Sequence, residues 1–282
     1  MAASAAVQRG VSMSTLVMGV VNVTPDSFSD GGMWFTTGAA VAHGLDLLEQ
    51  GADILDVGGE STRPGADRPV REEELHRVIP VIRELSRAGA RVSVDTMRAS
   101  VAAQAVDAGA SIVNDVSGGL ADPEMARVVA DAAVPFVVMH WRGHSDMMQD
   151  HASYDNVVAE VCQALDERAS DLCARGVNRE QLILDPGFGF AKLPEHNWSL
   201  LAHLDAVQSL GLPVLVGTSR KSFLGTVGLS PGQTPRPPAQ RDVGTAATTV
   251  IAALAGVWGV RVHDVASSVD ALRVVAAVEA AG

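Results

Sequence analysis

The sequence predicts a single (β/α)8 TIM barrel, an α/β fold whose active site lies at the C-terminal ends of its strands. Three observations predict it. A short apolar run occurs eight times along the chain, each run ends in glycine or a polar residue, and a helical-looking stretch follows. Runs this short, without polar alternation, are typical of strands buried on both faces of a parallel sheet. The 282 residues also suit the ~250 that such a barrel usually needs.

The expected strands follow one another at regular intervals. They span residues 16–21, 54–57, 92–94, 112–113, 136–139, 182–184, 214–216 and 260–262. The residues that follow them are Asn22, Gly58, Asp95, Asn114, His140, Asp185, Gly217 and His263. Because the carboxyl ends of the strands of such a barrel meet on one face, we expect these residues to surround one site.

The segments between the runs are expected to form the covering helices. In the clearest case Val157, Val161, Leu165, Ala169 and Leu172 fall on one stripe, as in a helix that faces a core. Glycine closes several helices just before the next strand, where it takes the left-handed turn at least cost. These glycines are Gly51, Gly89, Gly109, Gly176 and Gly211. No linker divides the chain, so we expect a flexible extension at 1–14 and one barrel domain at 15–282.

The composition favours a globular enzyme over a nucleic-acid-binding or membrane protein. Hydrophobic residues make up 47% of the chain and charged residues 19%, which is enough to bury a large core. The formal net charge of −12 repels nucleic acid and anionic membrane surfaces, so local cations must hold any anionic ligand. Residues 243–260 carry no charge but are rich in Ala, Thr and Gly. We interpret them as a buried last helix plus the eighth strand, not as a membrane span.

Two smaller features bear on location and mobility. Cys162 and Cys173 lie on one expected helix, about 16 Å apart along its axis, which is too far for a disulfide. We interpret them as reduced thiols of a cytoplasmic protein. Four prolines mark residues 226–240 as a mobile loop.

The loops after the first two strands contain more charged, hydroxyl and glycine residues than a turn requires. Residues 22–32 hold two carboxylates, three hydroxyls, an aromatic ring and a glycine pair. A capped turn at Asp26 and Ser27 would explain part of this, but the loop is long enough to fold over a ligand. Residues 58–65 add exposed glycine backbone, hydroxyls and Arg63, which suit a phosphate or a carboxylate. The alternative is a solvated surface arginine.

Polar residues at three strand ends predict a ligand site in the barrel mouth. Asp95, Asn114 and Asp185 each follow an apolar run directly and are expected to point into an enclosed mouth of low dielectric. An unpaired carboxylate there is costly, so these side chains need donors. A flat heterocycle with adjacent N–H and NH2 groups would supply them, and an Asn can both donate and accept. Structural ion pairs with Lys or Arg are the alternative.

Cations cluster after the seventh and eighth strands, where barrels of this fold often bind phosphate. The donors available there are Lys221, Ser222, Arg261 and His263. Strand alternation places Arg261 and His263 on the same side. An inward arginine at a strand end is hard to explain without an anion.

The sequence favours a hard cation over zinc. His140, His144 and His151 could be zinc ligands, but their spacing fits no helical or finger pattern. Magnesium keeps several waters and relies on the substrate, so an oxygen of Asn22 together with phosphate oxygens would suit it.

In order and spacing, these motifs resemble those of the bacterial dihydropteroate synthases. The resemblance covers nearly the whole chain, and seven motifs in one order are highly specific. The motifs are GVVNVTPDSFSDGG (19–32), GGESTRPG (58–65), SVDT (93–96), NDVSGG (114–119), LDPGFGF (184–190), SRKSFLG (219–225) and RVHD (261–264).

The resemblance implies a transferase of folate biosynthesis that joins 6-hydroxymethyl-7,8-dihydropterin pyrophosphate to 4-aminobenzoate and releases pyrophosphate. It also implies a set of contacts for each group. The pterin would contact Thr62, Asp95, Asn114, Met139, Asp185, Phe190 and Lys221. The pyrophosphate would contact Asn22, Thr62, Arg63, Arg261 and His263, with Mg2+ on Asn22. The 4-aminobenzoate, and sulfonamides in competition with it, would contact Phe28, Pro64, Phe190 and Ser222, where a helix start would meet the carboxylate.

Charge development favours an SN1-like order in which pyrophosphate departs first. The catalytic residues would be Asp30, Asp95, Lys221, Arg261 and His263. Cations and Mg2+ would stabilise the leaving group, and Asp30 the cationic pterin. The loops after the first two strands would close to exclude water. The resemblance also implies a homodimer through helices late in the barrel, for which the Ala-rich segment 245–255 would permit close packing.

The chain departs from the family pattern in two places. Ala191 stands where the family usually has Gly, and the loop 142–149 differs in its middle. Two other functions stay open. A pterin-dependent methyltransferase would share the barrel but require a corrinoid partner. A non-catalytic pterin-binding paralogue would have lost residues of the loops 22–32 or 58–65, which are intact here.

Overall fold

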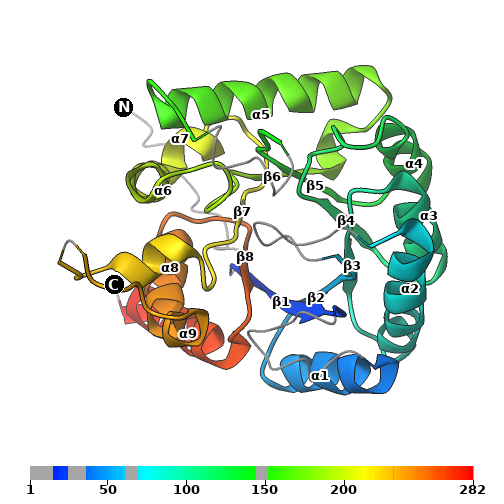
Figure 1. Cartoon of the computed structure of the whole chain (residues 1–282), viewed down its shortest axis with the longest axis horizontal. Coiled ribbons are helices and arrows are strands. Elements are labelled where there is room, and N and C mark those ends of the chain that lie inside the picture. Colours follow the sequence, from blue (N-terminus) through cyan, green and yellow to red (C-terminus); the bar gives the residue numbers. More distant parts are fainter. Residues whose placement is uncertain (1–14, 25–35, 61–68, 144–151, 231, 282) are drawn as a thin grey trace, which may run out of the picture.

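Eight parallel strands form a barrel that a ring of helices surrounds. The computed structural model describes residues 15–24, 36–60, 69–143, 152–230 and 232–281. The sheet has the order β6-β5-β4-β3-β2-β1-β8-β7, and a parallel bridge between Leu184 and Val214 connects its two ends. Figure 1 shows the strands at the centre with the helices around them. The expected fold class is therefore confirmed.

The strands lie where the apolar runs predict them. They are β1 (Leu16–Asn22), β2 (Ile54–Gly58), β3 (Val92–Asp95), β4 (Ile112–Asp115), β5 (Phe136–Met139), β6 (Leu182–Asp185), β7 (Leu215–Val216) and β8 (Gly259–Val262). The helices are α1 (Thr37–Glu49), α2 (Arg71–Arg87), α3 (Ala99–Asp107), α4 (Met125–Ala132), α5 (Val157–Ala174), α6 (Pro194–Ala202), α7 (Leu204–Gln208), α8 (Asp242–Leu254) and α9 (Val265–Ala281). Short 3-10 helices are η2 (Arg179–Gln181), η3 (Ser222–Thr226) and η4 (Pro238–Gln240).

Strand alternation explains why the barrel floor is apolar and its mouth polar. One buried cluster takes a residue from six strands and fills the floor: Met18, Ile54, Ile112, Val137, Ile183 and Leu215. Asp56, Asn114 and Asp185 each lie two residues after a floor residue on β2, β4 and β6, and therefore on the same side of the strand. The residues between them, such as Leu55 and Val113, belong to the core beneath the helices. The strands therefore hold the polar groups just above the apolar floor.

The helices form as the sequence predicts. All five residues of the expected stripe on α5 are buried. Gly51, Gly89, Gly109, Gly176 and Gly211 have φ between 74° and 114°, the left-handed region that glycine enters at least cost. Cys162 and Cys173 are free thiols on α5.

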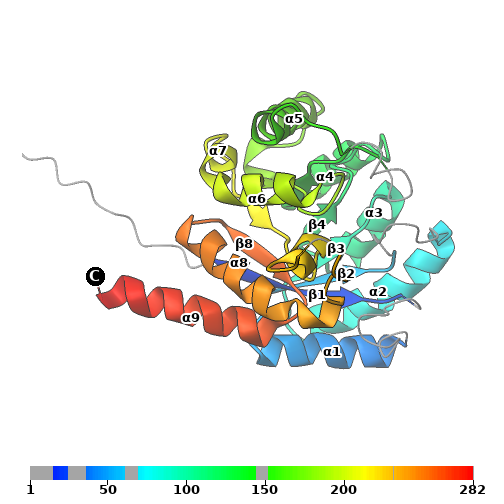
Figure 2. The same ribbon diagram turned by 60° about the vertical axis from the view of Figure 1, so that its left-hand side comes forward.

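The interpretation of residues 243–260 was wrong in part. The segment does contain α8 and part of β8, but α9 follows and is the last helix. In addition, α8 is not buried all round, because Val243, Ile251 and Leu254 are exposed. An uncharged, Ala- and Thr-rich helix has no polar face to mark its exposed side, so composition alone suggested complete burial. Figure 2 shows α8 and α9 next to each other on one flank of the barrel.

Two predictions concern flexible segments. Residues 226–240 form a loop. Among its described residues after η3, the regular element is η4. The mobility of this loop stays a prediction. The extension 1–14 lies outside the described residues. In the part of the chain that the structure describes, no helix is long and apolar enough to cross a membrane.

Candidate functional site

A buried carboxylate on β2 connects residues from three other strands. Oδ2 of Asp56 accepts a hydrogen bond from Nδ2 of Asn114 at 2.9 Å and another from Nε of Arg261 at 2.6 Å. Arg261 also donates from Nη2 to Oδ2 of Asp95 at 2.8 Å. The strands β2, β3, β4 and β8 therefore deliver one continuous hydrogen-bonded network to the mouth of the barrel.

Burial and pairing determine the charges in this network. Desolvation raises the pKa of Asp95 to about 7, Arg261 opposes this in part, and Asp56 adds to it. Burial would lower the pKa of Arg261, but Asp56 and Asp95 outweigh it and hold that pKa above its ordinary value. Arg261 therefore stays charged. Near neutral pH Asp95 passes between an ionised carboxylate, which can only accept hydrogen bonds, and a protonated carboxyl group.

A second group of site residues forms around the ends of β6 and β7. Nζ of Lys221 lies 3.7 Å from the centroid of the Phe190 ring, a cation–π contact. Burial lowers the pKa of Lys221 to about 8, and Arg261 acts in the same direction. Burial also raises the pKa of Asp185, whose Oδ1 accepts a hydrogen bond from the backbone N–H of Gly187 at 2.7 Å. The mouth thus combines carboxylates and cations with an aromatic ring.

A buried lysine holds the loop after β6 in place. Nζ of Lys192 lies 3.0 Å from Nδ1 of His140 and donates to the carbonyl oxygens of Gly187 at 3.1 Å and Phe190 at 3.2 Å. Burial lowers the pKa of Lys192 to about 7 and that of His140 to about 2. His140 is therefore neutral, and its Nδ1 can accept a hydrogen bond from the lysine. These bonds fix the backbone on both sides of Phe188 and so place Phe190.

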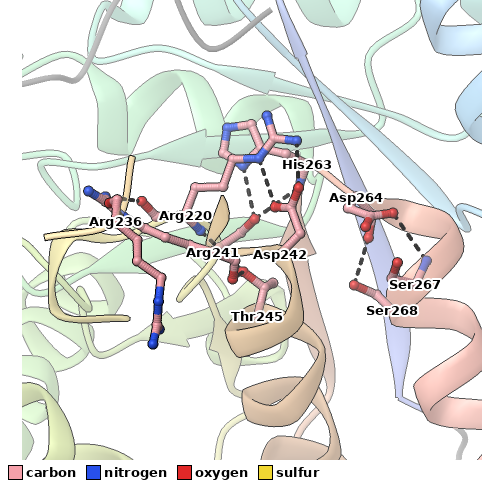
Figure 3. Close-up of polar contacts among 10 residues, drawn as sticks. Arg220, Arg236, Arg241, Asp242, Thr245, His263, Asp264, Ser267 and Ser268 are labelled. Carbon is pink, nitrogen blue, oxygen red and sulfur yellow. Dashed lines mark hydrogen bonds and ion pairs between the residues drawn. The ribbon is translucent and has the colours of Figure 1, made fainter. Parts of the chain in front are cut away.

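The loop after β7 is held by α8 and by the end of β8. Arg220 has a φ of 58°, in the left-handed region, and makes two hydrogen bonds to Asp242 of α8, from Nε at 2.8 Å and from Nη2 at 3.0 Å. Figure 3 shows this pair beside His263. Nδ1 of His263 lies 3.0 Å from Oγ of Ser219, which also accepts from the backbone N–H of His263 at 3.1 Å. Ser219 and Arg220, the two residues before Lys221, are therefore held in place.

The remaining expected site residues are placed as follows. Asn22 ends β1, Met139 ends β5 and Ser222 begins η3. The expected helix start at Ser222 is a five-residue 3-10 helix, so it offers less than the terminus of a full helix. Five expected residues lie outside the described ones: Phe28, Asp30, Thr62, Arg63 and Pro64.

The stems of the loop after β2 are described and tied together. Arg98, just beyond β3, donates to Oε2 of Glu60 at 3.0 Å and to the carbonyl oxygen of Pro69 at 2.7 Å. It also pairs with Glu74 of α2. One guanidinium therefore contacts both of the described residues that flank 61–68.

Sequence reasoning missed Asp56, Arg98 and Lys192. For Asp56 a signal was available, because a carboxylate two residues after Ile54 on the same strand must also point into the barrel, where an unpaired charge is costly. Arg98 and Lys192 follow strand ends in polar loops. Nothing in the sequence distinguishes these paired cations from solvated ones.

Comparison with known proteins finds similarity along nearly the whole chain. Residues 18–263 match the protein family described as pterin binding enzyme. A dihydropteroate synthase of Mycobacterium leprae is 51% identical over 262 residues, which cover 93% of this chain and 92% of the relative.

Solved structures are similar as well. A dihydropteroate synthase of Xanthomonas albilineans with 4-aminobenzoic acid superimposes with a TM-score of 0.87 at 49% identity, covering 95% of this chain and 94% of that one. The dihydropteroate synthase of Yersinia pestis in a sulfonamide drug complex gives a TM-score of 0.89 at 39% identity, and the match covers 96% of this chain and 98% of that one.

Proposed function

The chain belongs to the pterin binding enzyme family and, within it, to the dihydropteroate synthases, and from that premise we propose how its residues carry out the reaction. This transferase condenses 6-hydroxymethyl-7,8-dihydropterin pyrophosphate with 4-aminobenzoate to give 7,8-dihydropteroate and pyrophosphate. One observation supports the assignment of roles most strongly. The network of Asp95, Asn114 and Arg261 offers acceptors for a donor-rich heterocycle and a cation for its pyrophosphate in the same mouth.

The pterin is proposed to bind by its amino-pyrimidine edge. Ring N–H and NH2 groups would donate to Asp95 and Asp185, and Asn114 would contact the same edge. Lys221 and Phe190, already in contact with each other, would lie against the ring. Met139 and Thr62 complete the proposed set.

The pyrophosphate is proposed to bind Asn22, Thr62, Arg63, Arg261 and His263. Nε and Nη2 of Arg261 are engaged by Asp56 and Asp95, so Nη1 is the nitrogen best placed to meet the phosphate oxygens. Mg2+ fits this donor set. Asn22 supplies one amide oxygen, and the described residues hold no group of three or more Asp, Glu, His or Cys that would form a protein-made metal cage. Such a site suits an ion that relies on phosphate oxygens and water, and when bound it would supply positive charge to the leaving group.

The 4-aminobenzoate is proposed to bind beside the pterin. Its ring would contact Phe28, Pro64 and Phe190, and its carboxylate would accept from Ser222. Sulfonamides would compete there, because they present a similar aniline ring.

The proposed order of bond changes is SN1-like. The bond between the pterin methylene carbon and the pyrophosphate oxygen breaks first, and its electron pair leaves with pyrophosphate. Arg261, His263 and Lys221 would stabilise that charge, and Asp30 and Asp95 the cationic pterin. The lone pair of the aminobenzoate nitrogen then forms the new C–N bond, and its proton passes to solvent. An aniline needs no general base for this attack.

The proposed partner is a second copy of the chain. Exposed apolar side chains occur on neighbouring helices, Val243, Ile251 and Leu254 on α8 and Val274 and Val278 on α9. We propose that this face forms a homodimer. The free cysteines are in keeping with a proposed location in the cytoplasm.

The test is pyrophosphate release by the purified protein from dihydropterin pyrophosphate and Mg2+, with and without 4-aminobenzoate. Release that depends on aminobenzoate and yields dihydropteroate is expected. Pterin binding without turnover would instead indicate the non-catalytic paralogue, and a requirement for a corrinoid partner would indicate a methyltransferase.

A further inference from the structure

The carboxylate of Asp56 is not placed where it would serve stability. The side chain is 0% exposed in the middle of β2. Its Oδ2 accepts both of its hydrogen bonds, and its Oδ1 has no hydrogen-bond partner among the described residues. A buried polar atom without a partner costs free energy, and a buried ion pair is weak evidence for stability. A carboxylate kept in spite of this cost points to a role in the site.

The two bonds to Oδ2 decide how two side chains face the mouth. An ionised carboxylate can only accept, so Asn114 must turn its Nδ2 toward Asp56. The amide cannot flip without placing its carbonyl oxygen against the carboxylate. Nε of Arg261 is held in the same way at 2.6 Å, and from there Nη2 reaches Asp95 at 2.8 Å.

Asp56 also lies lower in the strand register than Asp95, the second acceptor of Arg261. In the parallel register of β2 and β3, Asp56 is level with Ser93, whereas Gly58 is level with Asp95. The guanidinium of Arg261 therefore bridges two carboxylates at different heights in the register of β2 and β3.

We propose that Asp56 is a positioning residue for dihydropterin pyrophosphate, which fixes the amide of Asn114 and the guanidinium of Arg261 before the substrate binds. This inference rests on the proposed function of the site. Asn114 and Arg261 are assigned to the pterin and its pyrophosphate, and neither is assigned to 4-aminobenzoate. Loss of Asp56 should therefore weaken one substrate and not the other.

Two substitutions separate geometry from charge. Asp56→Ala removes the shared acceptor, whereas Asp56→Asn keeps one acceptor oxygen and loses the charge. We expect the KM for dihydropterin pyrophosphate to rise by roughly tenfold or more in Asp56→Ala and by less in Asp56→Asn. The KM for 4-aminobenzoate should stay within about twofold of the unsubstituted enzyme.

Asp115→Asn is the matched control. Asp115 is also a fully buried carboxylate at a strand end, but its oxygens accept from Ser117 and the backbone N–H of Gly119 and take no part in the network around Asp56. Within the described part of the chain, Asp115 acts on the site only through its charge, which adds to the raised pKa of Asp95. This control should therefore lower stability and leave both KM values within about twofold of the unsubstituted enzyme. If Asp56→Asn behaved in the same way, Asp56 would be merely structural and the proposal would be overturned.

A double-mutant cycle tests the route of the effect. If Asp56 acts through Asn114, Asp56→Asn should raise the KM less in an Asn114→Ala background than in the unsubstituted enzyme. An equal rise in both backgrounds would overturn positioning through Asn114.

Binding of dihydropterin pyrophosphate with Mg2+ is also measured by calorimetry in every variant. The Kd then decides the role of Asp56 even if turnover is absent, and if Asp56→Ala does not fold, Asp56→Asn decides it alone.

Discussion

Ala191 occupies a backbone conformation that suits glycine. Its φ is 46°, in the left-handed region, and its side chain is buried. Its carbonyl oxygen accepts a hydrogen bond from the Tyr154 hydroxyl at 3.0 Å, which helps to hold the strained backbone. The departure from the family pattern at this position is therefore a cost in backbone strain, since a Cβ in the left-handed region meets the following carbonyl.

Ala191→Gly should raise the free energy of unfolding by about 1 kcal/mol, because relief of the left-handed strain exceeds the added chain entropy of glycine. Urea unfolding measures it. Ala102→Gly is the control, because Ala102 is buried within α3 and glycine there should destabilise by about 1 kcal/mol. A lower unfolding free energy for Ala191→Gly would contradict the strain argument.

The buried charges of the mouth should set the pH range of activity. Asp95 must be ionised to accept from the pterin, and burial raises its pKa to about 7, so it gains a proton as the pH falls below that value. Lys221 must be charged, and burial lowers its pKa to about 8, so it loses its proton as the pH rises above that value. We expect a bell-shaped profile of kcat/KM for dihydropterin pyrophosphate, with limbs near those two values. A flat profile across that range would show that neither group titrates in the free enzyme.

Asp30 is assigned the stabilisation of the cationic pterin, although it lies outside the described residues. Asp30→Asn should lower kcat by roughly a hundredfold, with little change in either KM, because the charge matters only once pyrophosphate has begun to leave. Steady-state kinetics with both substrates measure this. Unchanged turnover would remove Asp30 from the mechanism.

At the residue scale the sequence predicted which side chains meet in the mouth but not how they pair. Asp95, Asn114 and Arg261 were expected from their strand ends, and they do lie in one network. The direct ion pair of Arg261 with Asp95 was expected only as an alternative to ligand binding. Which carboxylate an arginine selects depends on register across the barrel, and no local pattern in the sequence carries that information.

Among the elements, α8 has a direct connection to the site. Its first residue, Asp242, binds the guanidinium of Arg220, and Thr245 one turn later accepts from the backbone N–H of Arg220 at 3.2 Å. Arg241 donates to the carbonyl oxygen of Arg220 at 2.8 Å. The start of α8 therefore holds the backbone that presents Lys221 and Ser222.

Asp242→Asn should loosen this connection and raise the KM for 4-aminobenzoate by about two- to fivefold, since a half-buried ion pair contributes about 1 kcal/mol. Initial rates at saturating dihydropterin pyrophosphate measure it. The control is Asp270→Asn on α9, which removes an exposed pair with Arg273 at 2.8 Å that touches no site residue. If both variants behaved alike, the link from α8 to the site would be unsupported.

Element type was predictable where periodicity is strong, and less so where composition is uniform. The stripe on α5 identified its helix because the two faces of that helix differ in polarity. The apolar runs identified strands because they are short and end in glycine or a polar residue. In α8, Ala and Thr occupy both faces, so its exposed side could not be recognised. At Ser222 a motif suggested a full helix, where only η3 forms.

For the whole molecule, the repeat of eight runs was sufficient to predict a closed barrel, because a parallel sheet with both faces covered admits few other arrangements at this length. Assembly is different. Whether an apolar face of these helices is exposed or buried depends on how α8 packs against α9 (Figure 2). The sequence does not show that packing. The resemblance implied a homodimer, and the exposed side chains of α8 and α9 add the face that we propose for it.

The combination of Leu254→Glu and Val278→Glu should convert the proposed dimer to a monomer. Two subunits of formal net charge −12 repel each other, so apolar burial must supply the attraction, and added carboxylates would both remove that burial and increase the repulsion. For the same reason moderate salt should tighten the unsubstituted dimer by screening the repulsion. Sedimentation equilibrium measures both effects. Val70→Glu is the control, because Val70 is similarly exposed but precedes α2, away from this face. A dimer that persists in the double variant, or that weakens when salt is added, would place the interface elsewhere on the molecule.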